Sequence, residues 1–409
     1  MRIAMLHPSL TWRGGAERQL LNLATEMQKA GHEIEIFTNA VNDKCYPELL
    51  NRLVVNVVRA PTINALQSIE LPKNSTSVIQ KRSDFRRLTG RFRSYTSDFR
   101  SMIFMGMKIP RGFDLINNHN FPTEWAAFFA KKRLNAPVVW MCNEPPFWFS
   151  DPLQRKGLGK INLPLFEGLD KVAVDYIDEI VVLSAIAGRR VEKAYGRSSK
   201  IIRSGVDIDL FHKASGEEIR LKHDLEKAFV LLQVGNIAND KRQSDSIVAL
   251  YYLSKKFDNV KLIFDGEGRL EKLVALSRKL GVEDKVQFWH THRDEELAKV
   301  YAACDVFVFP AQITWGLAVA EAMAASKPVL VSNKSGSSEI IQNNVNGIII
   351  EDANPKEMAA QIEKLINSPQ SRRKIGENAF EFASKHLSWK NYAKNMETVF
   401  QGAVANKLN

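Results

Sequence analysis

The chain has 409 residues, more than one hydrophobic core usually holds, so two domains of ordinary size are expected. Its three cysteines (Cys45, Cys142 and Cys304) are far apart and form no CxxC pair, which argues against a disulfide framework or a zinc site and favours a reducing compartment. The net charge of +11 favours a partner that carries negative charge, such as a phosphorylated small molecule, anionic lipid or nucleic acid.

The first segment predicts a strand, a glycine loop, a helix and a second strand. A short apolar run at 3–6 is followed by a loop that ends in Gly14 and Gly15, then by apolar residues at helical spacing over 16–30. Alternation over 33–37 predicts the next strand, so this unit belongs to a parallel sheet with a right-handed crossover. The N-terminal apolar run is broken early by His7 and Pro8, so no signal peptide is expected.

A basic segment follows at 81–111, with nine Lys and Arg residues against two Asp residues and therefore a net charge of +7. Aromatic and aliphatic residues lie among these charges, and five of them fall three or four positions apart: Phe85, Leu88, Phe92, Tyr95 and Phe99. Such spacing is typical of a basic amphipathic helix on an anionic membrane surface. A solvated basic face is the alternative. No uncharged apolar stretch is long enough to cross a bilayer.

Strand and helix patterns then alternate to the end of the chain. Strands are expected at 113–117, 137–142, 179–183, 229–234, 260–264, 286–289, 306–309, 328–331 and 347–350. Helices are expected at 123–133, 244–256, 269–280, 295–303, 317–325 and 388–404. The segment 204–222 has weak periodicity and resembles a linker. This order predicts an α/β protein with two doubly wound Rossmann-like domains, 1–203 and 204–387, that face a cleft, and a final helix, 388–409, that packs back on the first domain.

The motifs in the second half resemble the retaining glycosyltransferase family called GT4, whose fold is GT-B. The most specific part is Pro310-Ala-Gln-Ile-Thr-Trp-Gly-Leu-Ala-Val-Ala-Glu-Ala-Met-Ala324, followed by Lys327-Pro-Val, Gly336-Ser-Ser-Glu339 and Asn346-Gly347. Gly14-Gly-Ala-Glu17, Ser204-Gly-Val-Asp207 with Phe211, and Gly266-Glu-Gly268 support it. The resemblance runs nearly end to end, and it implies transfer of a sugar from a UDP-, GDP- or ADP-sugar to an acceptor.

The resemblance assigns the donor site mainly to the second domain. Gly316 and Leu317 open a helix whose backbone N–H groups and positive end suit a diphosphate. Glu321, about one turn further on, matches the glutamate that accepts hydrogen bonds from the ribose hydroxyls. Lys241 is expected on the donor diphosphate, with help from Arg242. For Arg242 a solvated loop residue remains an alternative.

The resemblance assigns further positions in the first domain. Gly14 and Gly15 bring backbone amides close to the donor phosphates, although a plain helix-entry turn fits the residues equally well. His119 follows a predicted strand, where the family's catalytic-site histidine touches the donor sugar. Glu144 also follows a predicted strand, and it either binds the acceptor or caps a turn.

Two positions depart from the family pattern. Ile313 stands where a second glutamate is usual, and Gln312 is the candidate to supply the missing polar contact. Asn236 replaces the usual arginine beside the phosphate-binding lysine. These departures bear on the identity of the donor sugar and keep open a non-catalytic family member.

The family implies retention at the anomeric carbon, and no paired carboxylates of the glycosidase kind are needed for it. Neither a metal nor a cofactor is expected, because helix ends, Lys241 and the glycine loop carry the positive charge toward the leaving diphosphate. The acceptor is expected to be lipid-linked or a growing glycan, and the location cytoplasmic or peripheral on a membrane. A nucleotide-sugar epimerase is a further alternative. Nucleic-acid binding ranks last, since no nucleic-acid-binding module is present.

Overall fold

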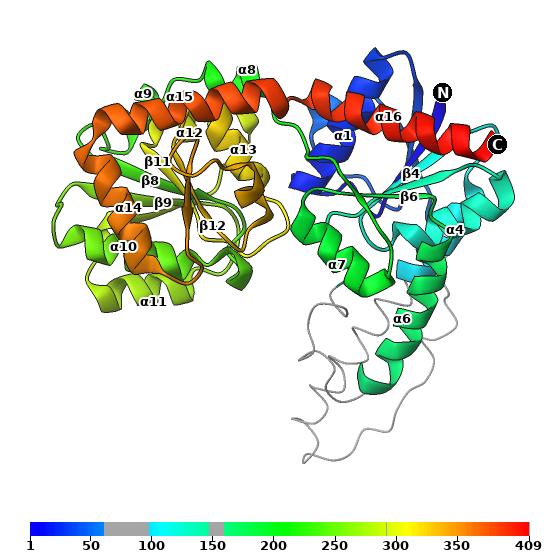
Figure 1. Cartoon of the computed structure of the whole chain (residues 1–409), viewed down its shortest axis with the longest axis horizontal. Coiled ribbons are helices and arrows are strands. Elements are labelled where there is room, and N and C mark those ends of the chain that lie inside the picture. The colour runs from blue at the N-terminus through cyan, green and yellow to red at the C-terminus, as the bar shows by residue number, and fades with distance from the viewer. Residues whose placement is uncertain (61–97, 147–158, 292, 409) are drawn as a thin grey trace. The chain divides into compact units, whose positions relative to one another are not determined.

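The computed structural model describes residues 1–60, 98–146, 159–291 and 293–408 (Figure 1). The chain divides into two compact units. The first comprises Met1–Val182, Arg190–Lys200 and Met396–Asn409, and the second comprises Leu183–Arg189 and Ile201–Asn395. Each unit has its own sheet with helices interleaved along the chain, which confirms the α/β class (Figure 1).

The sheet of the first unit has seven strands in the order β3-β2-β1-β4-β5-β6-β7. In this order they are β3 (Val54–Val57), β2 (Glu33–Thr38), β1 (Arg2–His7), β4 (Leu115–His119), β5 (Val138–Met141), β6 (Glu179–Val182) and β7 (Lys200–Ile201). The pairs from β3 to β6 are all parallel. Helices α1 (Gly15–Lys29), α2 (Pro47–Leu50), α4 (Thr123–Leu134) and α6 (Gly159–Asp175) belong to this unit, and α7 (Ala185–Tyr195) and α16 (Trp389–Leu408) each have residues in both units.

The sheet of the second unit has six strands in the order β10-β9-β8-β11-β12-β13, all paired in parallel. They are β10 (Val286–Trp289), β9 (Val260–Asp265), β8 (Phe229–Val234), β11 (Val306–Phe309), β12 (Val329–Ser332) and β13 (Ile348–Ile350). The α-helices are α8 (Ile208–His212), α9 (Glu217–Lys222), α10 (Gln243–Ser254), α11 (Glu271–Leu280), α12 (Asp294–Ala303), α13 (Leu317–Ala324), α14 (Pro355–Asn367) and α15 (Pro369–His386). The 3-10 helices are η3 (Asn239–Lys241), η4 (Glu283–Lys285) and η5 (Gly336–Ile340).

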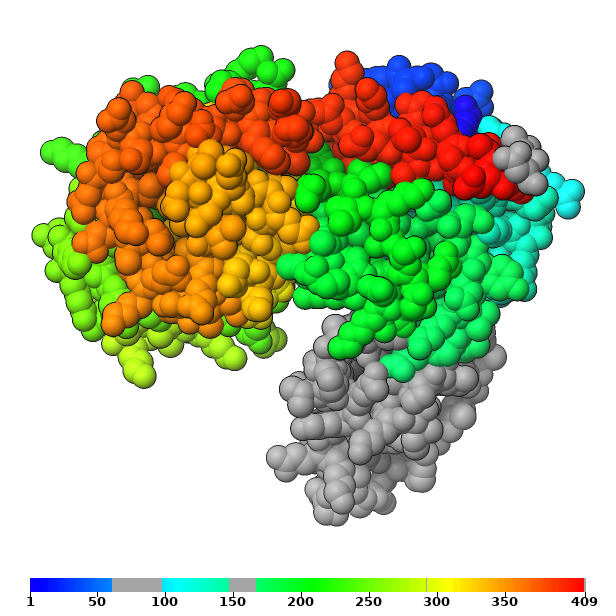
Figure 2. Space-filling view, in the orientation of Figure 1, coloured from blue at the N-terminus to red at the C-terminus, as the bar shows by residue number. Residues whose placement is uncertain are grey.

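Strands β8, β9 and β11 lie in the middle of this sheet, and their apolar residues meet α10 and α14 in one buried core. Leu231, Leu262 and Val308 from the sheet pack in it with Leu250 and Ile362 from the helices. Figure 2 shows α14 and α15, in orange, on the outer surface of this unit. The core therefore fixes the sheet, and the loops at its carboxyl edge lie outside the core.

The expected linker at 204–222 is wrong, because this segment is folded. It forms α8 and α9, and the Asp207 carboxylate caps α8 by accepting a hydrogen bond from the Leu210 N–H at 3.1 Å. Phe211 is buried, with its ring 5.4 Å from that of Tyr301 in α12. A single buried aromatic residue holds a helix too short to show a clear sequence period.

The last helix, α16, begins at Trp389, and its residues from Met396 onward belong to the first unit. The expected return of this helix to the first domain is confirmed. Met396 and Phe400 are buried, and the Glu397 carboxylate lies 3.0 Å from Nε2 of His32. Buried apolar residues and the contact between Glu397 and His32 therefore hold the end of α16 in the first unit.

Most of the basic segment 81–111 lies outside the described residues, including Phe85, Leu88, Phe92 and Tyr95. Residues 98–108 are helical, and here Phe99 faces the protein interior, with its ring 5.0 Å from that of Trp125. Phe99 is therefore a core residue, and it is not part of a membrane-facing surface. Within the described part of the chain, no helix combines the length and apolar character required for a membrane span.

Candidate functional site

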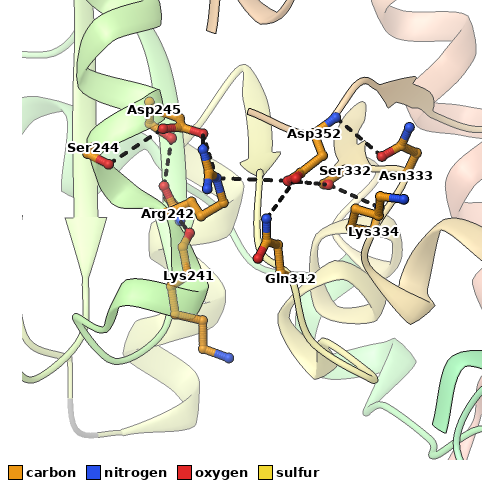
Figure 3. A network of polar contacts seen from close by, with 11 residues as sticks. Lys241, Arg242, Ser244, Asp245, Gln312, Ser332, Asn333, Lys334 and Asp352 are labelled. Carbon is orange, nitrogen blue, oxygen red and sulfur yellow. Dashed lines mark hydrogen bonds and ion pairs between the residues drawn. The ribbon is translucent and has the colours of Figure 1, made fainter. Parts of the chain in front are cut away.

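Polar side chains gather at the carboxyl edge of the second sheet (Figure 3). They come from the ends of β8, β11, β12 and β13 and the loops that follow. These four strands are neighbours in a parallel sheet, so their loops leave it at the same edge. The residues are Lys241 and Arg242, Gln312, Ser332 with Asn333 and Lys334, and Asp352. Ligands of doubly wound folds bind at this edge.

Asp352 is the centre of this network (Figure 3). One of its carboxylate oxygens accepts a hydrogen bond from Nε2 of Gln312 at 2.7 Å, and the other lies 3.9 Å from Nε of Arg242. The backbone N–H of Gln312 donates to the carbonyl of Asp240 at 2.8 Å. Gln312 is thereby fixed by both its side chain and its backbone. Asp352 was missed from the sequence, since a lone aspartate after a short strand carries no motif.

Lys241 and Arg242 are adjacent but have different surroundings. Arg242 has a left-handed backbone with φ of 53°, and its guanidinium donates to Asp245 at 2.7 Å. The Lys241 carbonyl accepts a hydrogen bond from Gln233 at 2.8 Å, while its side chain extends away from the network (Figure 3). Its Nζ lies 3.6 Å from the Asp240 carboxylate. Lys241 therefore suits a phosphate ligand better than Arg242, because its side chain extends out of the network, whereas that of Arg242 lies between Asp245 and Asp352.

Helix α13 begins where the sequence predicts, directly after Gly316. A side chain is excluded at Gly316, because an added Cβ would lie 2.4 Å from the Phe309 ring. The N–H of Gly316, expected to be open to a diphosphate, donates instead to Oγ of Ser337 at 2.8 Å. The reason is that η5 packs against this helix end and supplies a hydroxyl there. Leu317 is the first residue of the helix and is partly buried.

Glu321 lies one turn into α13 and is buried, with 4% of its surface exposed. One of its carboxylate oxygens accepts a hydrogen bond from the Tyr301 hydroxyl at 2.8 Å. Burial of a carboxylate is costly unless it is hydrogen-bonded, so Tyr301 both stabilises and orients it. Tyr301 is a second residue that the sequence did not reveal.

The motif Gly336-Ser-Ser-Glu339 forms hydrogen bonds that hold neighbouring segments in place. The Gly336 N–H donates to the carbonyl of Ile313 at 2.9 Å, and a Cβ at Gly336 would lie 1.7 Å from the Thr314 carbonyl oxygen. Glu339 accepts hydrogen bonds from the N–H groups of Ala185 and Ile186, at 2.9 and 3.1 Å. Ile313 thus contributes its backbone to the site edge, which its apolar side chain does not prevent.

At the carboxyl edge of the first sheet, Gly14 caps α1 and Gly15 is its first residue. The Gly14 carbonyl accepts a hydrogen bond from the Tyr46 hydroxyl at 3.2 Å. An added Cβ at Gly14 would lie 2.3 Å from a carboxylate oxygen of Glu17. These contacts define the helix entry closely, and they fit either the phosphate interpretation or the plain turn.

His119 is the last residue of β4, two positions beyond the expected end of that strand. It is fully buried, and its Nε2 lies 2.8 Å from Oδ1 of Asn117. The amide nitrogen of Asn117 donates to the Val139 carbonyl, so its oxygen must accept from His119 Nε2–H. Nδ1 is then an acceptor, and it has no hydrogen-bond partner among the described residues. Burial lowers the pKa of His119 well below its ordinary value, so the ring is neutral.

Glu144 follows β5 and pairs with the guanidinium of Arg190. Its side chain is 44% exposed. Because β4 and β5 are parallel neighbours, the residues after each strand leave the sheet at the same edge. The predicted site residues therefore fall into two sets, one at the carboxyl edge of each sheet.

Two family models match the chain on either side of residues 211–214. The model described as Glycosyltransferase Family 4 matches residues 13–210, and the one described as Glycosyl transferases group 1 matches residues 215–382. An uncharacterized glycosyltransferase of Methanocaldococcus jannaschii is 33% identical over 424 residues, which cover 99% of each chain. Spore coat protein SA of Bacillus subtilis is 26% identical over 71% of this chain and 78% of its own length.

Solved structures share the architecture. The crystal structure of HepE from Anabaena in complex with UDP and glucose superposes with a TM-score of 0.74 at 20% identity, over 98% of this chain and 99% of that one. Sucrose-phosphate synthase from Thermosynechococcus elongatus also gives a TM-score of 0.74, at 16% identity, over 99% of this chain and 100% of that one. Both sheets described above belong to the GT-B fold.

Proposed function

The chain belongs to the GT4-type glycosyltransferases, and from this premise we propose that it transfers a sugar from a nucleotide-diphosphate sugar with retention at the anomeric carbon. One observation carries the proposal. Glu321 is buried and oriented on α13, beside a helix entry that Ser337 and Gly336 hold in place. A buried, oriented carboxylate is suited to accept hydrogen bonds from ribose hydroxyls.

In this proposal the second unit holds the nucleotide. Lys241 contacts the diphosphate, and the positive end of α13, at Gly316 and Leu317, adds to its stabilisation. Gln312 contacts the sugar in place of the usual glutamate, with its amide oriented by Asp352. Arg242 acts indirectly, since Asp245 and Asp352 hold it in the network.

The first unit would supply the sugar and acceptor contacts. His119 accepts a hydrogen bond from a donor-sugar hydroxyl through Nδ1, and Gly14 and Gly15 bring amides to the phosphates. Glu144 contacts the acceptor, and Arg190 limits its movement. In the transfer, the bond from the anomeric carbon to the phosphate oxygen breaks and a bond to the acceptor oxygen forms. The nucleoside diphosphate leaves with the electron pair of the broken bond, and it takes up the proton that the acceptor hydroxyl gives up.

The acceptor that we propose is lipid-linked or a growing glycan on a cytosolic membrane face. The basic segment 81–111 supports this, because its net charge of +7 would attract anionic lipid at about 1 kcal/mol for each basic residue near the surface. Changing Arg86, Arg87, Arg91 and Arg93 to serine should reduce co-sedimentation with anionic liposomes. High salt should have the same effect on the wild type. A wild type that ignores anionic liposomes at low salt would favour a soluble acceptor.

The donor is tested by thermal shift with UDP-, GDP- and ADP-sugars, with Glu321→Ala as the matched control. The expected result is stabilisation by sugars of one nucleotide, which the variant loses. A wild type that no nucleotide sugar stabilises would favour the non-catalytic alternative, which Ile313 and Asn236 motivate. If free nucleotide sugar is epimerised without acceptor, the chain is an epimerase.

A further inference from the structure

His7 is a buried polar residue that the proposed reaction leaves without a role. It is the last residue of β1 and is 2% exposed. A buried imidazole is costly unless both of its nitrogens are hydrogen-bonded. Both are: Nδ1 lies 2.8 Å from the Ser9 carbonyl, and Nε2 lies 3.2 Å from Nδ2 of Asn120.

These partners fix the tautomer of His7. A carbonyl oxygen only accepts hydrogen bonds, so Nδ1 must carry the hydrogen. The amide nitrogen of Asn120 only donates, so Nε2 must be the acceptor. The ring is then neutral, in keeping with burial, which lowers its pKa to about 4.

The chain of hydrogen bonds continues beyond His7. Oδ1 of Asn120 accepts a hydrogen bond from Nδ2 of Asn143 at 2.8 Å. Asn120 has a left-handed backbone with φ of 61°, and its carbonyl accepts from the Thr123 hydroxyl at 2.6 Å. Ser9, Asn120 and Asn143 belong to the segments that leave the sheet after β1, β4 and β5. His7 and Asn120 together therefore link three loops at one edge of the sheet.

Each linked loop carries a residue of the proposed site. The loop after β1 leads to Gly14 and Gly15, and Asn120 directly follows His119 in the sequence. Asn143 directly precedes Glu144 in the sequence. We propose that His7 is a positioning residue, whose Nδ1–H tautomer holds the turn at His119 and the segment at Glu144 in register for transfer. This inference rests on the proposed function.

Two substitutions at His7 test the roles of its two ring nitrogens one at a time. The side-chain amide of Gln reaches the place of Nε2, so His7→Gln keeps an acceptor for Asn120 and loses the donor to Ser9. The amide of Asn reaches only the place of Nδ1, so His7→Asn keeps the donor to Ser9 and releases Asn120. The proposal expects His7→Gln to rescue function and His7→Asn to lose it. His386→Gln, at an exposed position on α15, is the matched control.

The first measurement needs no substrate. In protein labelled with ¹⁵N-histidine, two-bond ¹H–¹⁵N correlation at pH 7 should show His7 with a protonated Nδ1 and an unprotonated Nε2. The Nε2–H signal of His119 and the amide signals of Asn143 should persist in His7→Gln and move in His7→Asn. The opposite His7 tautomer, or equal effects of the two variants on these signals, would overturn the proposal whether or not the chain is an active transferase.

The second measurement follows release of the nucleoside diphosphate from the donor that binds the wild type: UDP from UDP-glucose, GDP from a GDP-sugar or ADP from an ADP-sugar. We expect kcat to fall about tenfold in His7→Asn, the effect of losing one oriented hydrogen bond, and to stay within about threefold in His7→Gln. KM for the donor should change less than about twofold in both. A purely structural role would instead lower the melting temperature of both variants and leave kcat unchanged. A wild type without turnover on any donor would count against the proposed function alone.

Discussion

At the scale of single residues, Glu321 has two separable contacts, the one to Tyr301 and the one proposed to ribose. Glu321→Gln keeps an oxygen that accepts from Tyr301, whereas Glu321→Ala removes this acceptor of the Tyr301 hydroxyl. We expect both to weaken binding of the nucleoside diphosphate by about 1–3 kcal/mol, the range for losing a charged acceptor. Only the alanine variant should also lose melting temperature. Calorimetric affinities equal to the wild type in Glu321→Gln would contradict the ribose assignment.

Lys241 and Arg242 offer a matched pair for the diphosphate. Lys241→Ala should weaken binding of the nucleoside diphosphate far more than that of the nucleoside, because the proposed contact is to phosphate. Arg242→Ala should mainly lower stability, since it removes the ion pairs to Asp245 and Asp352. Titration calorimetry with UDP and uridine, or the matching pair for another base, distinguishes the two. An equal loss for both ligands in Lys241→Ala would place that side chain elsewhere.

At the scale of elements, helices α4 and α6 bury two carboxyls against each other, Glu124 and Asp170. Burial raises the pKa of both, that of Asp170 to about 6, and the Tyr195 hydroxyl donates to Asp170 at 2.6 Å. The folded protein therefore binds more protons than the unfolded chain between about pH 4 and pH 6. The stability that these groups contribute is present below about pH 4 and is lost as pH rises through this window.

Asp170→Asn should flatten that dependence. We expect the variant to gain on the order of 2–3 kcal/mol relative to the wild type between pH 4 and pH 6, because an amide does not ionise. Urea denaturation at pH 4, 5, 6 and 7 measures it, with the exposed Asp175→Asn on the same helix as the control. Parallel curves for wild type and Asp170→Asn would show that Asp170 keeps an ordinary pKa.

Most elements could be predicted where the sequence has a clear period. β8, β10 and β11 begin and end at the predicted residues. In β8 and β11, short and mainly apolar runs define buried parallel strands. By contrast, the sequence predicts a linker where α8 and α9 lie, since helices of five and six residues are too short to show a period. β3 was missed for a related reason: it lies at the sheet edge, and its Val54 and Val57 are exposed.

The site was predictable only where a motif marks it. Gly316 and Glu321 stand in a recognisable run, and the structure places them on the same short helix. Asp352, Tyr301 and Ser337 act through side chains that meet only after the chain has folded, from elements far apart in the sequence. Tertiary contacts of this kind leave no local pattern, so the partners of Gln312, Glu321 and Gly316 could not be inferred.

At the scale of the whole molecule, the two units repeat one design with different chemistry at the sheet edge. The first places neutral, buried histidines and asparagines at the ends of β1 and β4. The second places charged residues, including Lys241, Arg242 and Asp352, in the loops after β8 and β13. Charged groups suit a diphosphate, and neutral polar groups suit sugar hydroxyls. The charged edge of the second unit is therefore the place where we propose that the donor nucleotide binds.

The most direct test of glycosyl transfer follows the anomeric proton of the donor by NMR. Purified protein is incubated with the nucleotide sugar that binds it, with and without membrane lipid extract as a source of acceptor. For the wild type we expect acceptor-dependent loss of the donor signal, release of the nucleoside diphosphate, and a product of the same anomeric configuration. With Glu321→Ala we expect the donor signal to stay unchanged. An inverted product would contradict retention. A donor that binds yet stays intact, or is epimerised without acceptor, would contradict the assignment of this chain as an active glycosyltransferase.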